Sequence, residues 1–388
     1  MKILYVVNNA GFFCSHRLSL ALAAREAGHE VALLTGQAGS PTLEVRALEQ
    51  LRRLGVLHHV VAFSSGGLAP WTELKGLAQT LAFMRRWQPD LVHCASPKGV
   101  LYGSLAARVS NRPALTLAVS GMGSLFAGER SGFAIQTLRR LYLSVAKFGF
   151  SHPNCRIIVQ NTDDYQLLVE QGLTSPQRLV LIPGSGVALD EFANPAWHTR
   201  SDLVVLPARI IREKGVMEFV EAARQLRAGG CRWRFALVGP ADYDNPSALD
   251  SEQIASWVSD GTIESWGHRD NMVEIFAQAK IVCLPSYREG LPKALLEAAA
   301  AGCAVITTDT VGCRESVIPG VSGDLVPVKD AAALTIALKR LIEDPTRQAS
   351  FGKAGRQLAC ERFGLEAVTA ATLAIYRQLL GSEPLAAT

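Results

Sequence analysis

The chain has 388 residues, and its 39 Lys and Arg against 35 Asp and Glu give a formal net charge of +4. This length exceeds what one hydrophobic core comfortably supports, so we expect two domains. With 48% hydrophobic residues, 19% charged residues and 33 glycines, the composition excludes intrinsic disorder and a collagen-like repeat. Its apolar stretches are short or interrupted by charge, as in 294–306, so we predict no transmembrane span.

The N-terminus and the cysteines indicate a reducing compartment. Residues 1–7 run into Asn8 and Asn9 without the cleavage pattern of a signal peptide, so we interpret them as a buried strand. No two of the eight cysteines form a C-x-x-C pair, and we interpret them as reduced core thiols rather than as disulfides or metal ligands. We therefore expect a cytoplasmic protein.

The first half of the chain alternates short apolar strands with helical stretches. The predicted strands cover residues 2–7, 30–35, 91–94, 114–119 and 156–160. A loop with Gly11 precedes a helix predicted over 16–27. This alternation is typical of a parallel, doubly wound sheet, so residues 1–190 are predicted to form a Rossmann-like domain.

The same alternation restarts after a polar, turn-rich segment near residue 195. The predicted strands cover residues 203–208, 234–238, 262–264, 281–284 and 304–307, and the helices 215–228, 252–260, 271–277 and 293–301. Residues 200–364 are thus predicted to form a second Rossmann-like domain, and 365–388 a last helix that can pack back on the first. We expect an α/β protein whose two domains face each other across a ligand-binding cleft.

A helix N-terminus suited to anions is predicted in the second domain. The sequence Pro-Ser-Tyr-Arg-Glu-Gly-Leu-Pro-Lys over 285–293 follows an apolar strand and opens a helix. Pro292 suits the first helical turn, so Gly290, Leu291 and Lys293 would lie with it at a positively polarised terminus. Such termini bind anions, including diphosphates.

Two carboxylates border this terminus. Glu297 lies four residues after Lys293, on the same helix face, and Glu289 precedes the helix in the loop. A carboxylate does not itself bind phosphate, so we expect both to accept hydrogen bonds from sugar hydroxyls, one from a hexose and one from a ribose. The alternative is a helix with a surface glutamate and an ordinary i,i+4 pair.

A basic segment, Arg-Ile-Ile-Arg-Glu-Lys-Gly over 209–215, also follows a strand and precedes a helix. Arg209 offers a planar fork of donors and Lys214 a compact charge, and together they could stabilise the negative charge that grows on a leaving nucleotide. The alternative is a group of solvated charges at a helix entry. We expect Glu289, Arg209 and Lys214 to be the catalytic residues.

These motifs resemble those of the family 4 retaining glycosyltransferases of GT-B fold. The resemblance rests on the E-x7-E from Glu289 to Glu297, the Arg-x4-Lys-Gly that starts at Arg209, and Pro-Gly-Ser-Gly-Val over 183–187, and it spans nearly the whole chain. It implies that Glu289 contacts the donor hexose, Glu297 the ribose, and Arg209 and Lys214 the diphosphate. It also implies retention of anomeric configuration and favours a UDP-linked donor.

The segments 11–17 and 120–126 look like the subset of this family that builds lipid-linked bacterial glycans. They follow strands of the first domain and would form the acceptor side. The expected acceptor-side residues are His16, Ser120, Gly121 and Gly123. For His16 we also weigh a structural role, as a helix-terminal histidine packed against the loop. Many family members carry a Gly-Gly pair in the first loop, and here only Gly11 is present to approach the donor.

We expect no metal and no other cofactor besides the nucleotide sugar. The basic side chains and the helix terminus already supply positive charge, and Asp242-Tyr243-Asp244 is interpreted as a chance imitation of a D-x-D metal motif. Gly121-Met122-Gly123 lacks the third glycine of a dinucleotide fingerprint, which argues against NAD.

The charge is distributed unevenly. Residues 1–183 contain 18 Lys and Arg against 10 Asp and Glu, and residues 184–388 contain 21 against 25. The basic half shows no nucleic-acid-binding motif, so we expect no nucleic-acid partner. A phosphorylated acceptor or an anionic membrane surface would explain the excess. The basic, apolar stretch 136–150 would suit peripheral attachment to the cytoplasmic membrane face, unless it is a core helix with solvated charges.

The sequence therefore predicts transfer of a hexosyl or N-acetylhexosaminyl group from a UDP-sugar to a hydroxyl of a lipid-linked saccharide, in cell-surface glycan biosynthesis. Two alternatives remain. One is a nucleotide-sugar isomerase or phosphorylase of the same architecture, and the other is a noncatalytic subunit that only binds nucleotide sugars.

Overall fold

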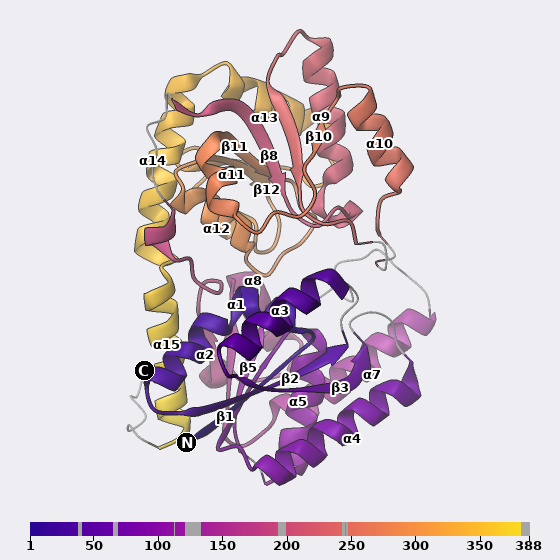
Figure 1. The fold of residues 1–388 in the computed structure, drawn as a ribbon, viewed down its shortest axis with the longest axis vertical. Helices are drawn as coiled ribbons and strands as arrows, with labels where there is room; N and C mark the ends of the chain where they lie inside the picture. Colours follow the sequence, from indigo (N-terminus) through magenta and orange to yellow (C-terminus); the bar gives the residue numbers. More distant parts are fainter. Residues whose placement is uncertain are drawn as a thin grey trace. The chain divides into compact units, whose positions relative to one another are not determined.

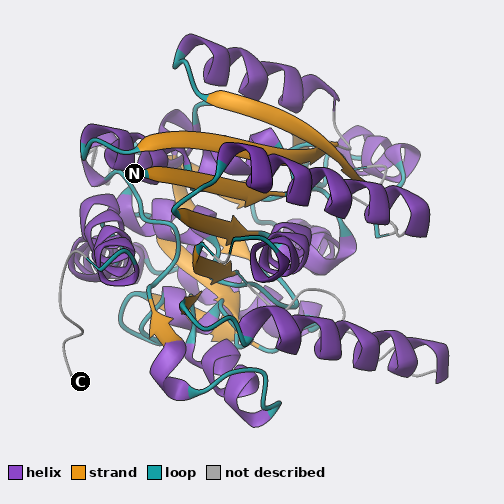
Figure 2. Cartoon of the chain, turned by 90° about the horizontal axis from the view of Figure 1, so that it is seen from below, coloured by secondary structure: helices purple, strands orange, loops and turns teal. Residues whose placement is uncertain are grey.

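The computed structural model describes residues 1–37, 41–64, 69–111, 113–120, 133–192, 199–242, 245 and 247–381. Its contacts divide the chain into two compact units (Figure 1). Unit 1 comprises residues 1–185 and 368–388, and unit 2 comprises residues 186–367. The two Rossmann-like domains predicted from the sequence are confirmed, because each unit is built on a parallel sheet flanked by helices (Figure 2).

The described strands of unit 1 form a seven-stranded parallel sheet in the order β3-β2-β1-β4-β5-β6-β7. These strands are β1 (Lys2–Val7), β2 (Glu30–Gln37), β3 (Leu57–Ser64), β4 (Leu91–Ala95), β5 (Ala114–Val119), β6 (Cys155–Val159) and β7 (Leu179–Leu181). The side chains of β1 alternate between two hydrophobic clusters, Leu4 in one and Tyr5 in the other. Because both faces are covered, the central strands β1, β4 and β5 are almost entirely buried.

The described helices of unit 1 lie on both faces of this sheet. They are α1 (Ala10–His16), α2 (Leu18–Glu26), α3 (Pro41–Arg53), α4 (Pro70–Trp87), α5 (Pro97–Val109), α7 (Phe133–Phe150), α8 (Thr162–Glu170) and α15 (Leu365–Leu379). Helix α15 brings the C-terminal part of the chain into unit 1. Its Tyr376 is buried in the same cluster as Tyr5, and the two hydroxyls are 3.1 Å apart.

The predicted loop around Gly11 is wrong, whereas the helix predicted over 16–27 is observed as α2 (Leu18–Glu26). A helix already begins at Ala10, and the chain breaks at Arg17, where φ is −133°, before α2. Asn9 is the N-cap residue of α1, since its side chain accepts a hydrogen bond from the Phe12 amide at 2.7 Å. Gly11 therefore lies in the first turn of a helix.

The described strands of unit 2 form a six-stranded parallel sheet in the order β10-β9-β8-β11-β12-β13. The strands are β8 (Ser201–Pro207), β9 (Arg234–Val238), β10 (Glu264–Ser265), β11 (Ala279–Leu284), β12 (Ala304–Thr308) and β13 (Gly323–Val326). The order reverses between β8 and β11, the kind of switch point at which open α/β sheets bind ligands. The strand predicted over 262–264 lies two residues later than expected.

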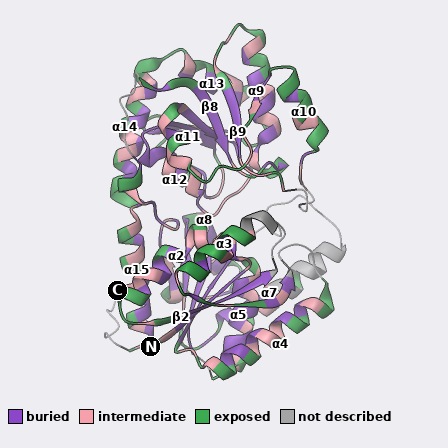
Figure 3. Ribbon diagram, in the orientation of Figure 1, coloured by how far each residue is buried: buried purple, intermediate pink, exposed green. Residues whose placement is uncertain are grey.

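The described helices of unit 2 cover both faces of its sheet. They are α9 (Val216–Ala228), α10 (Ser251–Ser259), α11 (Met272–Gln278), α12 (Lys293–Ala300), α13 (Ala331–Ile342) and α14 (Pro345–Arg362). In each unit the central strands are buried and the helices expose one face (Figure 3). Among the described helices none is long and apolar enough to cross a membrane. All eight cysteines are free thiols, five of them buried.

Candidate active site

Two loops of unit 2 meet at the carboxyl ends of the adjacent strands β8 and β11. The first, residues 208–215, contains a 3₁₀ turn over Arg212–Lys214, and the second covers residues 285–292. The Tyr287 amide in the second loop donates a hydrogen bond to the Glu213 carbonyl in the first at 2.9 Å. Gly215, with φ of +71°, packs so closely on the Pro285 carbonyl that a Cβ at this position would clash with it. The switch point therefore holds the two motifs against each other.

Lys214 and Glu289, one from each loop, form an ion pair. Their side chains are only 18% and 14% exposed, so the pair is largely shielded from water. The Ser286 hydroxyl donates to the same Glu289 Oε1 at 2.8 Å, and the Glu289 amide donates to the Val311 carbonyl at 3.0 Å. Both the carboxylate and its backbone are thus held in place.

The Glu289 loop rests on Gly312, which follows β12. Gly312 has φ of +78°, and a Cβ at this position would lie 2.5 Å from the Glu289 carbonyl oxygen. Only glycine combines this backbone conformation with so close an approach. The segment that follows β12 therefore fixes the position of the loop that carries the Glu289 carboxylate.

Helix α12 begins directly after this loop. Its N-cap residue is Pro292, which has no side-chain acceptor to bond the amides of the first turn. The Leu291 side chain is buried in the core of unit 2 and anchors the loop. The side chain of the N-cap residue does not cap this terminus, whose polarity favours an anion, and binding of a diphosphate by Gly290 and its neighbours stays a prediction.

Lys293 and Glu297 lie on one face of α12, with Lys293 Nζ 3.3 Å from Glu297 Oε1. Burial raises the pKa of Glu297, and the charge of Lys293 opposes this shift. A buried carboxylate gains when a ligand hydroxyl donates to it, because a hydrogen bond replaces lost hydration. The position of Glu297 fits the hydroxyl acceptor predicted for it.

Arg209 is paired differently from Lys214. Its Nη1 lies 2.5 Å from Asp242 Oδ2, and the two side chains are 52% and 27% exposed. Exposed ion pairs contribute little, so a diphosphate could displace this carboxylate at small cost. Asp244, the second carboxylate of the D-x-D sequence, lies outside the described residues. Within the described ranges no group of three or more His, Cys, Asp or Glu is arranged to hold a metal ion.

The site residues predicted in unit 1 lie in several different local environments. The Gly11 amide donates to Glu44 Oε2 at 3.2 Å, so a carboxylate of this chain engages it. The His16 ring stacks on Phe12 with centroids 4.7 Å apart. Ser120 directly follows β5. Gly121 and Gly123 lie outside the described residues.

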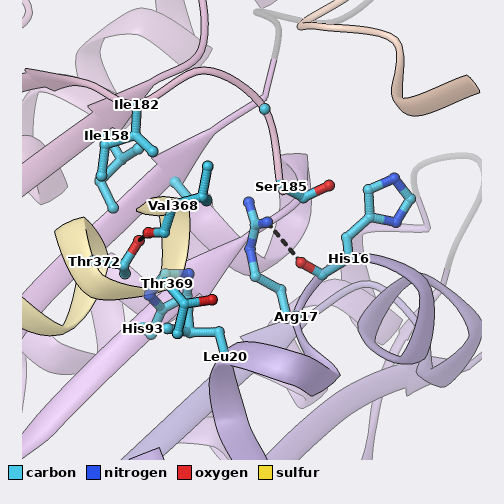
Figure 4. Close-up of a pocket in the computed structure, with 12 residues that line it drawn as sticks. His16, Arg17, Leu20, His93, Ile158, Ile182, Ser185, Val368, Thr369 and Thr372 are labelled. Carbon is cyan, nitrogen blue, oxygen red and sulfur yellow. Dashed lines mark hydrogen bonds between the residues drawn. The ribbon is translucent and has the colours of Figure 1, made fainter. Parts of the chain in front are cut away.

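Sequence reasoning missed several polar residues that the structure brings to these sites. Ser286 was part of the quoted motif but had no role, and Asp242 was considered only as a metal ligand. Arg17 lay in the segment 11–17 assigned to the acceptor side but had no role of its own. A small pocket in unit 1 is lined by Arg17, His93 and residues of α15 (Figure 4).

Two doubly wound units, with cations and carboxylates on the switch-point loops of the second, define a glycosyltransferase of the GT-B class. Two family models match the chain. "Glycosyl transferase 4-like domain" covers residues 15–184, and "Glycosyl transferases group 1" covers residues 201–344. The chain belongs to this family of group 1 and 4-like glycosyltransferases, which confirms the resemblance seen in its motifs.

Individual proteins agree with this assignment. The N,N'-diacetylbacillosaminyl-diphospho-undecaprenol alpha-1,3-N-acetylgalactosaminyltransferase of Campylobacter jejuni is 28% identical over 326 residues, 81% of this chain and 84% of that protein. The sucrose-phosphate synthase structure from Thermosynechococcus elongatus has a TM-score of 0.79 at 20% identity and covers 99% of this chain and 100% of its own. Anabaena Alr3699/HepE in complex with UDP-glucose has a TM-score of 0.75 at 17% identity, with 96% and 99% covered. These structural matches show the fold.

Proposed function

We propose that this glycosyltransferase moves a hexosyl or N-acetylhexosaminyl group from a UDP-sugar to a hydroxyl of a lipid-linked saccharide, in cell-surface glycan synthesis. The observation that carries the proposal is the shielded Lys214–Glu289 pair beside the N-terminus of α12, at the switch point of unit 2. The name of the Campylobacter relative, which acts on a diphospho-undecaprenol-linked acceptor, supports the acceptor class. The UDP-glucose complex of a protein of the same fold supports the donor class.

In this proposal the cations of unit 2 stabilise the departing nucleotide. Lys214 and Arg209 place positive charge at the end of β8, and α12 directs its N-terminus to the same loops. Negative charge grows on the diphosphate as the bond to the sugar breaks, so these groups bind the transition state more strongly than the ground state. The reaction then needs no metal ion to neutralise the leaving group.

The two glutamates orient the donor. Oε1 of Glu289 is already bonded to Lys214 and Ser286. The other carboxylate oxygen, Oε2, can accept a hydrogen bond from a hexose hydroxyl. Glu297 accepts from the ribose. We further propose that configuration is retained, with the acceptor hydroxyl approaching the face from which the nucleotide departs. The cytoplasmic face of the membrane is the proposed location.

A donor panel tests this proposal. The full chain is titrated with UDP-, GDP- and ADP-sugars and followed by thermal unfolding, since a ligand that binds only the folded state raises the melting temperature. We expect stabilisation by a UDP-sugar that is lost in Lys214→Met. Lys280→Met is the matched control, because Lys280 is similarly shielded, at 19% exposure, and also paired with a carboxylate, but lies on β11 away from the switch-point loops. Stabilisation by none of the sugars would refute the proposal.

Turnover separates the remaining alternatives. Incubation with donor alone yields a new sugar nucleotide if the protein is an isomerase, and slow hydrolysis at most if it is a transferase. A noncatalytic binding subunit would bind the donor and show no transfer to lipid-linked acceptors. Transfer that persists in a chelator supports metal independence, and transfer abolished by the chelator contradicts it.

A further inference from the structure

A small pocket of unit 1 opens near the carboxyl ends of its central strands, under α15. Its cavity volume is about 20 Å³, the scale of one or two water-sized groups and too small for a sugar ring. Arg17 enters from the α1–α2 junction and points toward the segment that carries Ser185 (Figure 4). His93 lines the pocket from β4.

Arg17 is a buried cation that pairs with no acidic side chain in the part of the chain that the structure describes. The residue is only 6% exposed, and its Nη1 donates a hydrogen bond to the His16 carbonyl at 2.9 Å. Nε is buried and has no hydrogen-bond partner among the described residues. Burial lowers the pKa of the guanidinium. A buried cation that lacks a counter-ion destabilises a protein, and such groups concentrate where a ligand is bound.

His93 adds a second unsatisfied group to the same pocket. Its Nδ1 lies 2.8 Å from the Tyr376 hydroxyl, whose oxygen is 3.1 Å from the Tyr5 hydroxyl. Its Nε2 is buried and has no partner among the described residues. If Tyr376 donates to Nδ1, the proton sits on Nε2, which then becomes a donor. Burial and the nearby charge of Arg17 lower the pKa of His93, so the ring stays neutral.

We propose that this pocket is an anion subsite, in which Arg17 and His93 bind a phosphoryl oxygen of the acceptor. The inference rests on the proposed function, in which the acceptor is a lipid-linked saccharide. The donor's diphosphate has its own cations in unit 2, whereas the pocket lies wholly within unit 1. A guanidinium and an imidazole N–H provide two donors for one oxyanion, and the small volume admits a phosphoryl oxygen.

The first experiment measures anion binding without turnover. Inorganic phosphate is titrated into the full chain saturated with UDP, at constant ionic strength, and thermal unfolding is followed. We expect phosphate to stabilise the wild type, to have no effect on Arg17→Met, and to retain part of its effect on Arg17→Lys. Arg178→Met is the control, because Arg178 donates to two carbonyls of unit 1, those of Phe150 and His152, at 3.1 and 2.7 Å. That variant should lose stability and keep its phosphate response.

Stability provides a readout that distinguishes binding from a structural role. Without phosphate, Arg17→Met should melt at the same temperature as the wild type or higher, because the change removes an uncompensated buried charge. An Arg17→Met protein that melts lower and still responds to phosphate would overturn the proposal, because the arginine would then serve only to cap α1.

Kinetics identify the source of the phosphoryl group. We expect Arg17→Gln to raise the KM for a diphosphate-linked acceptor by about tenfold or more, the scale of one charged hydrogen bond. The KM for the donor, and the rate with a neutral glycoside acceptor, should stay within about twofold. A donor KM that rises instead would refute the assignment to the acceptor. If Lys214→Met leaves donor turnover intact, the proposed function fails, whereas an unchanged phosphate response in Arg17→Met refutes the subsite alone.

Discussion

Gly312→Ala is expected to damage activity far more than a glycine change of the same backbone type elsewhere in unit 2. Gly312 has φ of +78° and supports the loop that carries Glu289, where a Cβ would lie 2.5 Å from two carbonyl oxygens, those of Glu289 and Gly290. Gly261, between α10 and β10, has φ of +74° and nothing within 4 Å of the same ideal Cβ. Comparing Gly312→Ala with Gly261→Ala therefore separates the effect of backbone strain from the effect of the steric clash with the Glu289 loop.

The structure gives the expected magnitudes. A left-handed conformation costs alanine about 1–2 kcal/mol, which is the whole expected effect of Gly261→Ala. At Gly312 the carbonyls must also retreat by at least about 0.5 Å to reach the shortest normal contact, which adds roughly 1–3 kcal/mol of overpacking. A shift of this size moves Glu289 relative to Lys214, and misplacement of about 1 Å can lower a rate about a hundredfold.

Both variants are measured in the same two assays. Urea unfolding of the full chain, followed by tryptophan fluorescence, reports stability, and transfer from the UDP-sugar reports kcat and KM. We expect Gly261→Ala to keep kcat near the wild-type value and Gly312→Ala to lose roughly tenfold to a hundredfold. Equal losses of stability and equal rates in the two variants would refute the argument that Gly312 positions Glu289.

Three further predictions concern charge and burial. Burial raises the pKa of Glu297 above its ordinary value of 4.5, so the native state binds this proton more tightly than the unfolded chain, and stability falls as the pH rises through the folded pKa. Glu297→Gln should therefore raise the melting temperature at pH 7, lose that advantage near pH 4, and raise the donor KM. Asp242→Asn frees Arg209 from a weak ion pair and should lower the donor KM by no more than about fivefold, and an increase would contradict displacement of Asp242 by the diphosphate. Thiol labelling of the native protein, mapped by mass spectrometry, should modify exposed Cys360 first and spare Cys283, whose pKa burial raises.

The central strands of both sheets were predictable because they are short apolar runs between turn residues. Strands β3, β7 and β13 were missed, because β3 carries two histidines and β7 and β13 are only three and four residues long. The strand expected over 91–94 occurs at Leu91–Ala95, and the helix expected over 215–228 at Val216–Ala228. Helix α1 was missed although its N-cap residue Asn9 is visible in the sequence, and a second contact that supports it is distant in sequence. Glu44, in α3, accepts hydrogen bonds from the amides of Ala10 and Gly11. A local pattern with a glycine and no acidic residue in the first turn does not reveal that partner.

The loops of the donor site were predictable in part. Each follows a strand, and parallel strands that are neighbours at a switch point bring their following loops together. Which cation would pair with which carboxylate was not predictable, because pairing depends on strand order and register. Lys214 meets Glu289, 75 residues away, through the pairing of β8 with β11, and Arg209 meets Asp242 after β9 instead.

Arg17 in unit 1 differs in electrostatic state from Lys214 and Arg209 in unit 2, and this difference has consequences for binding. Lys214 and Arg209 are each paired with a carboxylate of this chain, so an anionic ligand there exchanges one ion pair for another and gains only the difference. Arg17 has no such partner among the described residues, so an anion that reaches it recovers the full attraction and relieves an existing penalty. The sequence alone does not separate these three basic residues. Only burial and pairing in the fold distinguish a cation that must exchange its partner from one that still requires a partner.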